Sequence, residues 1–142
     1  MNPQSTDIDI AIVGGAMVGA SLALALDNLG RQLKRPLKLA LIEAHAPGTG
    51  QSGFDARAIA VAHGSRHLLQ QLGIWPKLAP LGTAIHDIHV SDRGHFGMTE
   101  INSRSFNLDA LGAVVELERV GQTLFAALAK TCLLYTSPSP RD

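Results

Sequence analysis

The stretch Ile8–Leu26, which reads IDIAIVGGAMVGASLALAL, constrains the fold more than any other part of this 142-residue chain. It opens with the apolar run Ile8–Val13, which is rich in β-branched residues and short enough for a buried strand. The run breaks at Gly14-Gly15, and from Ala20 onward the residues are mainly Ala and Leu, which favour a helix. A strand, a glycine turn and a helix in this order predict a dinucleotide-binding unit.

The expected turn uses its glycines and the first helical residues in separate ways. Gly14 and Gly15 let the chain reverse tightly after the strand, and Gly19 lets the first helical turn pack closely on that strand. Met17 and Val18 begin the helix, whose unpaired backbone N–H groups and positive dipole end would face a pyrophosphate. We therefore predict that these five residues contact a dinucleotide cofactor.

Ala16 belongs to the same predicted cofactor-binding loop but departs from its usual pattern. It occupies the position of the middle glycine of G-x-G-x-x-G. That glycine normally lets the backbone approach the phosphates. The extra methyl group either weakens cofactor binding or is accommodated by a small shift of the loop, and the sequence leaves both outcomes open.

Glu43 supplies the second half of the motif. It follows the apolar run Leu37–Ile42, which predicts a second buried strand. An acid at the end of this strand, about 20 residues beyond the last glycine, is the expected acceptor for the ribose hydroxyls of the cofactor. We prefer this interpretation to an ordinary loop carboxylate, and we expect FAD or NAD rather than NADP.

The overall composition excludes several classes of protein. The 12 basic and 12 acidic residues give a formal net charge of zero, which offers no electrostatic reason to bind nucleic acid or an anionic membrane. Cys132 is the single cysteine, so the chain has neither a disulfide framework nor a thiolate metal site. The segment before Ile10 has no Lys or Arg, unlike a secretory signal, and we expect a cytoplasmic protein.

The rest of the chain predicts an α/β fold of incomplete Rossmann type with a β-hairpin insertion. A βαβ unit is expected over residues 7–43, a helix over 58–72, a hairpin over 84–101, a strand over 113–117 and a helix over 120–130. Two parallel strands and a hairpin cannot complete a doubly wound sheet, so residues 1–130 are expected to form part of a cofactor-binding domain. Residues 131–142 end in a Ser/Pro tail that fits no element, and we interpret this tail as non-native.

Two further side chains are candidates for the cofactor site. Arg57 follows a Gly-rich loop and could either bind a pyrophosphate or form a surface ion pair with Asp55. Gln122 lies at the start of the last helix, where it could contact the cofactor or solvent. His86 and His89 lie three residues apart on an expected strand and point to opposite faces, so we expect no metal site.

An ordered series of motifs adds a resemblance to a known family. The motifs are DIAIVGGAMVGASLALAL, IEA at Glu43, GFDARAIAVA, IHVSDRGHFG and VVELERVGQTLFAAL. Together they resemble the N-terminal part of the UbiH-type flavin hydroxylases, the 2-octaprenyl-6-methoxyphenyl hydroxylases of ubiquinone biosynthesis. The resemblance covers residues 7–130. Its first motif is shared by many flavoproteins, whereas the FDARAIA and HVSDRGHFG segments are much more specific.

The resemblance implies an FAD-dependent aromatic monooxygenase with the para-hydroxybenzoate hydroxylase fold. Such enzymes use NAD(P)H as reductant and O2 to hydroxylate a polyprenylated phenol. Because the cofactor carries this chemistry, no side chain of the present chain is expected to be catalytic. The lipophilic substrate implies contact with a membrane surface or with other proteins of the ubiquinone pathway.

The resemblance also assigns roles to individual residues. The three glycines of the turn would line the pyrophosphate and Glu43 would hold the ribose. Arg57 would approach the flavin or its phosphates, and Gln122 is a weaker candidate for cofactor contact. Ala16 departs from the family's usual glycine. The second FAD motif and most of the substrate pocket of the family would lie beyond residue 130.

Two alternative functions remain open at the level of sequence. An NAD-dependent Rossmann oxidoreductase would share the first βαβ unit, although the Gly-rich loop and the hairpin replace the alternating βα units expected of it. A nucleotide-binding fragment without catalytic activity of its own is the second alternative.

Overall fold

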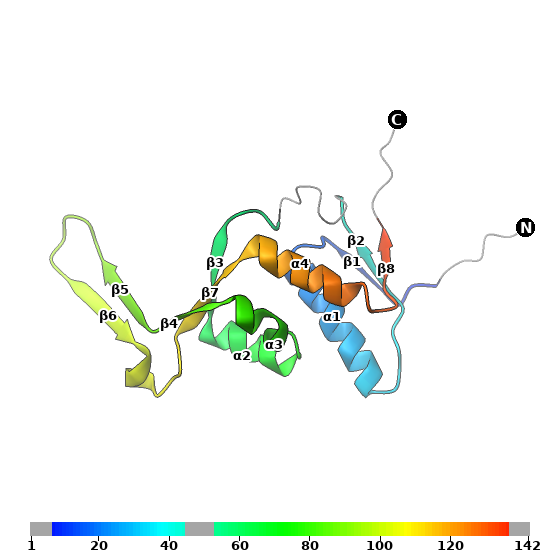
Figure 1. The fold of residues 1–142 in the computed structure, drawn as a ribbon, viewed down its shortest axis with the longest axis horizontal. Helices are drawn as coiled ribbons and strands as arrows, with labels where there is room; N and C mark the ends of the chain where they lie inside the picture. The colour runs from blue at the N-terminus through cyan, green and yellow to red at the C-terminus, as the bar shows by residue number, and fades with distance from the viewer. Residues whose placement is uncertain (1–6, 45–52, 137–142) are drawn as a thin grey trace, which may run out of the picture.

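The computed structural model describes residues 7–44 and 53–136, which form three small sheets and the helices packed against them (Figure 1). The first sheet is parallel and has the order β1-β2-β8. Its strands are β1 (Ile10–Val13), β2 (Leu39–Ile42) and β8 (Leu134–Thr136).

Helix α1 (Met17–Gln32) connects β1 to β2 and confirms the predicted βαβ unit. The register pairs Ile10 with Leu39 and Val13 with Ile42. The buried face of α1 carries mainly small residues, and residues 39–41 of β2 are buried. The loop of residues 14–16 therefore lies at the carboxyl end of β1, next to the carboxyl end of β2.

The second sheet is antiparallel and has the order β3-β7-β4. Helix α4 follows β7 without a gap and runs beside α1, while α2 and α3 lie between β3 and β4 in the chain (Figure 1). The elements are β3 (Ala58–Ala62), α2 (His63–Gln71), α3 (Trp75–Leu78), the 3-10 turn η1 (Ala79–Leu81), β4 (Thr83–Ile85), β7 (Gly112–Glu116) and α4 (Leu117–Leu128).

The third sheet is a hairpin that projects from the end of the molecule opposite the parallel sheet (Figure 1). Strand β5 (Asp87–Ser91) pairs with β6 (Met98–Asn102), and the 3-10 turn η2 (Ser103–Phe106) follows. All five residues of β5 are exposed. The base of the hairpin is closed by the backbone N–H of Ser103, which donates to the carbonyl oxygen of His86 at 2.8 Å.

One core joins the two larger sheets through α1, α3 and α4. Trp75 is 9% exposed and packs within this core. The largest fully buried side chains are Leu41, Ile74, Leu78, Val115, Val120 and Leu124. Gly73 follows the end of α2 with a φ of +71°, a conformation common for glycine after a helix C-terminus. Within the described ranges, no helix is both long and apolar enough to cross a membrane.

The predicted helix over residues 58–72 is wrong in its first part, because Ala58–Ala62 forms β3. Ile59 and Val61 alternate with alanines, and the backbone hydrogen bonds of this segment go to β7. Alanine is the strongest helix former, but intrinsic propensity is a weak preference, and here the long-range pairing with β7 overrides it. Helix α2 starts at His63, and Arg57 therefore precedes a strand rather than a helix.

Other predicted boundaries also shift. The hairpin over 84–101 exists only from Asp87 to Asn102, because Thr83–Ile85 pairs with β7 instead of continuing the hairpin. The strand over 113–117 is Gly112–Glu116, and the helix over 120–130 begins three residues earlier and ends at Leu128. No element was expected after residue 130, but Leu134–Thr136 pairs in parallel with β2. Residues 45–52 of the predicted Gly-rich loop and 137–142 of the tail lie outside the described residues.

Candidate nucleotide-binding site

The turn between β1 and α1 has the geometry that its glycines predict. Gly14 adopts a φ of +96°, a conformation that L side chains rarely adopt. Its backbone N–H donates to the carbonyl oxygen of Ile42 at 2.8 Å, which fixes the turn to the end of β2. A Cβ atom on Gly19 would overlap the carbonyl oxygen of Gly14, so only glycine permits this approach of helix to turn.

The N-terminus of α1 presents backbone donors to the same turn. Ala16 is the N-cap residue and has an extended backbone, with a φ of −69° and a ψ of −171°. It provides no side-chain cap, and the first turn of α1 contains no acidic residue. The first N–H groups of a helix lack partners within the helix, so this end of α1 can accept an anion. Met17 and Val18 supply the first of these donors, as predicted.

Glu43 lies directly beside the glycine turn. The backbone N–H of Gly15 donates to Oε2 of Glu43 at 2.5 Å, although 28 residues separate the two in the chain. A Cβ atom on Gly15 would lie 3.1 Å from that oxygen and 3.2 Å from the Glu43 Cβ, so a larger residue would crowd the carboxylate. The structure thus brings the seven predicted residues of the βαβ unit, 14–19 and 43, to one edge of the parallel sheet.

Gly53 and Phe54 are neighbours of this site that the sequence patterns did not single out. A Cβ atom on Gly53 would overlap the Cβ of Ala16, so the segment after the Gly-rich loop packs against the methyl group at the middle glycine position. Phe54 is 8% exposed and lies in edge contact with Phe125, with ring centroids 5.7 Å apart. A Cβ atom on Gly121 would lie 2.5 Å from the Phe54 ring. The sequence signal that could have identified Phe54 is its place as an aromatic residue directly after the Gly-rich loop.

Arg57 forms the ion pair that was one of its two predicted roles. Its Nε donates to both carboxylate oxygens of Asp55 at 2.7 Å. This hydrogen bond lowers the pKa of the Asp55 carboxyl, and Asp55 raises the pKa of Arg57. The carbonyl oxygen of Arg57 accepts from the N–H of Leu117, so the residue stands where α4 begins. Its side chain is 69% exposed and accessible to an anion.

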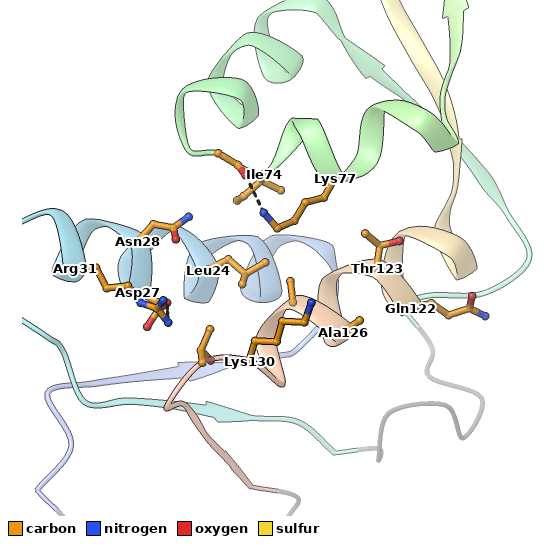
Figure 2. A pocket seen from close by; sticks show the side chains of 13 residues that line it. Leu24, Asp27, Asn28, Arg31, Ile74, Lys77, Gln122, Thr123, Ala126 and Lys130 are labelled. Atoms are coloured by element: carbon orange, nitrogen blue, oxygen red, sulfur yellow. Dashed lines mark hydrogen bonds and ion pairs between the residues drawn. The ribbon is translucent and has the colours of Figure 1, made fainter.

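Gln122 is exposed on α4 and lines a cavity of about 560 Å³ between α1, α3 and α4. Figure 2 shows Gln122 toward one end of this space, and Lys77 and Lys130 between the helices. Lys77 Nζ donates to the carbonyl oxygen of Gly73 at 3.4 Å. Cofactor contact by Gln122 therefore remains a prediction, because the turn and Glu43 are not among the residues that line this cavity.

The residues at the sheet edge fit the phosphate and ribose portions of a dinucleotide. Helix N–H groups and a tight glycine turn suit a pyrophosphate, and an ionised carboxylate offers several acceptor sites to ribose hydroxyls. A carboxylate that accepts one N–H, as Glu43 accepts that of Gly15, still has further acceptor lone pairs. The methyl group of Ala16 stands at the position where the usual glycine lets the backbone approach the phosphates. Among the described residues there is no group of three or more potential metal ligands of the His, Cys, Asp or Glu type.

Comparison with known proteins shows the family to which the chain belongs. A family model described as FAD dependent oxidoreductase matches residues 9–132. The ubiquinone hydroxylase UbiL of Rhodospirillum rubrum is 29% identical over 128 residues, which cover 86% of this chain and 27% of UbiL. The ubiquinone hydroxylase UbiM of Neisseria meningitidis is 38% identical over 76 residues, or 53% of this chain and 15% of UbiM. The chain thus spans about a quarter or less of these relatives.

Solved structures share the fold at low sequence identity. The p-nitrophenol 4-monooxygenase PnpA of Pseudomonas putida superposes with a TM-score of 0.67 at 16% identity, over 89% of this chain and 31% of PnpA. PqsL of Pseudomonas aeruginosa, described as a probable FAD-dependent monooxygenase, also has a TM-score of 0.67 at 16% identity, over 90% of this chain and 32% of PqsL. The glycine turn, Glu43 and these matches together identify the chain as a member of the FAD dependent oxidoreductase family.

Proposed function

We propose that this chain forms the nucleotide-binding part of an FAD-dependent monooxygenase that hydroxylates a polyprenylated phenol in ubiquinone biosynthesis. The observation that best supports nucleotide binding is the hydrogen bond from Gly15 to Glu43, because it holds a carboxylate beside the glycine turn. The similarity to UbiL and UbiM supports the substrate class. NAD(P)H as reductant and O2 as co-substrate follow from the same proposal.

In this proposal the residues of the chain bind and orient the cofactor. The N–H groups at the start of α1 hold the pyrophosphate, since the helix dipole and the unpaired donors both favour an anion there. Glu43 accepts hydrogen bonds from the ribose of the adenosine. Arg57 exchanges part of its pairing with Asp55 for the phosphates or the flavin. FAD, when bound, supplies the oxidation–reduction chemistry.

The chemical step itself is assigned to parts of the family fold that this chain does not span. The chain covers 27% of UbiL, and none of its described side chains needs to act as a nucleophile or a general base in the proposed reaction. We therefore propose that the isolated chain binds FAD without hydroxylating the phenol. Association with a membrane surface or with other proteins of the pathway would depend on the complete enzyme.

A chimera tests the proposed function. The 128 aligned residues of UbiL would be replaced by the corresponding segment of this chain in a strain of Rhodospirillum rubrum that lacks UbiL. We expect the chimera to restore ubiquinone, measured by chromatography of extracted quinones, and we expect Glu43→Gln to reduce that yield. Glu100→Gln on the exposed hairpin is the matched control. A chimera that accumulates and binds FAD but restores no ubiquinone would contradict the proposed substrate class.

A further inference from the structure

Residues 53–57, which precede β3, form a short segment that packs closely on two helices. At its first residue, a Cβ atom on Gly53 would overlap the Cβ of Ala16, the N-cap residue of α1. At its second residue, the Phe54 side chain lies on Gly121 of α4, where a Cβ atom would be 2.5 Å from the Phe54 Cγ and 2.9 Å from its Cβ. The 53–57 segment therefore connects the start of α1 to α4.

Phe54 is the residue that attaches this segment to α4. It is buried, whereas Arg57 at the other end of the segment is exposed. The Phe54 ring also meets Phe125 edge to face. Gly121 and Phe125 are four residues apart and so lie on one face of α4. Burial of the ring on this face supplies the apolar contact that an otherwise exposed segment lacks.

The backbone of Arg57 is attached to the same helix, one turn earlier. Its carbonyl oxygen accepts from the N–H of Leu117 at 2.9 Å. Leu117 is the first residue of α4 and lies four residues before Gly121. Residues 54–57 thus run along the first turn of α4, with Phe54 at its far end and Arg57 at its start. The position of the Arg57 backbone is set by α4, while its side chain stays exposed.

We infer that Phe54 is a positioning residue for cofactor binding, because its ring fixes the 53–57 segment to α4 and thereby holds Arg57 in place. A long side chain on a backbone that is already fixed loses less conformational freedom when it binds a ligand. The contact of Gly53 with Ala16 joins the same segment to the predicted cofactor loop. This inference rests on the proposed function, since it takes Arg57 as a contact of FAD.

The Phe54 ring is also part of the common core, so a loss of stability alone does not distinguish positioning from packing. The distinction lies in Arg57. If Phe54 acts through Arg57, its effect on FAD affinity must disappear when Arg57 has no side chain to position. An effect through general packing would be the same whether or not the Arg57 side chain is present.

A double-mutant cycle in the full 142-residue chain makes this comparison. Phe54→Leu keeps an apolar side chain but removes the ring from Gly121 and Phe125. We expect it to raise the Kd for FAD about fivefold in the wild-type background, as for one side chain that must be immobilised on binding. In an Arg57→Ala background the same substitution should change the Kd by less than about 1.5-fold.

Leu128→Ala is the control for stability. Leu128 is buried at the other end of α4, about 16 Å from Leu117 at the rise of an α-helix. Its truncation should destabilise the chain by leaving a cavity. At a temperature where all variants are folded, it should leave the Kd for FAD unchanged.

Hydrogen exchange of the Leu117 amide provides a measurement without cofactor. As the first residue of α4, Leu117 has no acceptor for its N–H within the helix, so the carbonyl oxygen of Arg57 protects this amide. Phe54→Leu should accelerate its exchange at least about fivefold relative to the amides of β7. Leu128→Ala should leave this ratio unchanged.

The outcomes separate the inference from the proposed function. Equal effects of Phe54→Leu on the Kd in the two backgrounds would overturn the inference, as would an unchanged exchange ratio for Leu117. Absence of FAD binding by the wild-type chain would contradict the proposed function and, with it, a role of Phe54 in binding. Exchange at Leu117 would in that case still show whether Phe54 fixes Arg57.

Discussion

At the scale of residues, the proposed nucleotide site depends on glycines, because the absence of a side chain lets neighbouring groups approach closely. The turn after β1 brings the carbonyl oxygen of Gly14 to the point where any other residue at position 19 would place its Cβ. The N–H of Gly15 can reach Glu43 because no side chain separates the two. Adding a single methyl group at Gly15 or Gly19 should therefore destabilise this arrangement, although the added group is small.

Gly19→Ala tests the close approach of α1 to the turn. The added Cβ must push the helix away from the Gly14 carbonyl, and we expect a loss of about 2 kcal/mol in the free energy of unfolding, typical of overpacking. Gly64→Ala on α2 is the matched control, because its Cβ would meet nothing within 4 Å, and it should leave stability unchanged or raise it by up to about 1 kcal/mol. Urea denaturation compares them, and equal effects would contradict this packing.

Ala16 and Gly53 provide a double-mutant cycle at the mouth of the site. Gly53→Ala should destabilise the chain by about 1–2 kcal/mol, because the new Cβ overlaps that of Ala16. The same substitution should cost little in an Ala16→Gly background, where the nearest remaining atom is the Cα at 3.4 Å. Ala16→Gly alone should also tighten FAD binding. Additive effects of the two substitutions in thermal denaturation would show that the two residues do not touch.

At the scale of elements, local patterns predicted the structure well where the pairing is also local. The β1-α1-β2 unit and the β5–β6 hairpin follow from glycine turns and apolar runs that lie close in the sequence. Strand β3 was missed because its alanines are typical of a helix and its partner, β7, begins 50 residues after β3 ends. Glu43 was predicted as a site residue from its spacing alone. Gly53 was not, because its contact with Ala16 exists only in three dimensions.

An ion pair that connects α2 to the segment before β7 gives a pH-dependent prediction. The guanidinium of Arg66 hydrogen-bonds to Asp109 and lowers the pKa of that carboxyl below its ordinary value of 3.8. A lowered pKa in the folded state contributes stability above pH 3.8, and this contribution is lost as the pH falls through the folded value. Asp109→Asn should therefore lower the melting temperature slightly at pH 6, and this difference should shrink as the pH falls below 3.8.

The matched control for this effect is ionic strength. The Asp109 side chain is 69% exposed, so 0.5 M NaCl should reduce the difference between wild type and Asp109→Asn at pH 6. A difference that persists unchanged at pH 2.5 would show that Asp109 stabilises the chain by some means other than its charge.

The hairpin is expected to be dispensable for nucleotide binding. All of β5 is exposed, and the hydrogen bond from Ser103 to His86 already brings the two ends of the hairpin together. Replacing residues 87–102 by a short Gly-Ser turn should therefore leave both the melting temperature and the affinity for FAD within error of the intact chain. A marked loss of either quantity, in calorimetry or titration, would show that the hairpin supports the site.

At the scale of the whole molecule, the chain combines the proposed nucleotide site with several exposed apolar side chains. The residues that contact the predicted pyrophosphate and ribose positions come from one βαβ unit, so this half of the site can form within the chain. Val18, Leu22 and Leu29 on one face of α1, and all five residues of β5 in the hairpin, are exposed. Sequence reasoning could not predict that one face of α1 is exposed, because a leucine-rich helix has the same pattern whether one or two of its faces are covered.

The most direct test of the account is a titration of the full chain with FAD, followed by quenching of flavin fluorescence, for wild type and Glu43→Gln. The amide can still accept the N–H of Gly15 but lacks the charge that favours ribose hydroxyls. We predict saturable binding by wild type, a Kd raised about tenfold by Glu43→Gln, equivalent to about 1.4 kcal/mol, and no change for the Glu100→Gln control. Absence of binding by wild type, or equal affinity of the two Glu43 forms, would contradict the assignment of this site.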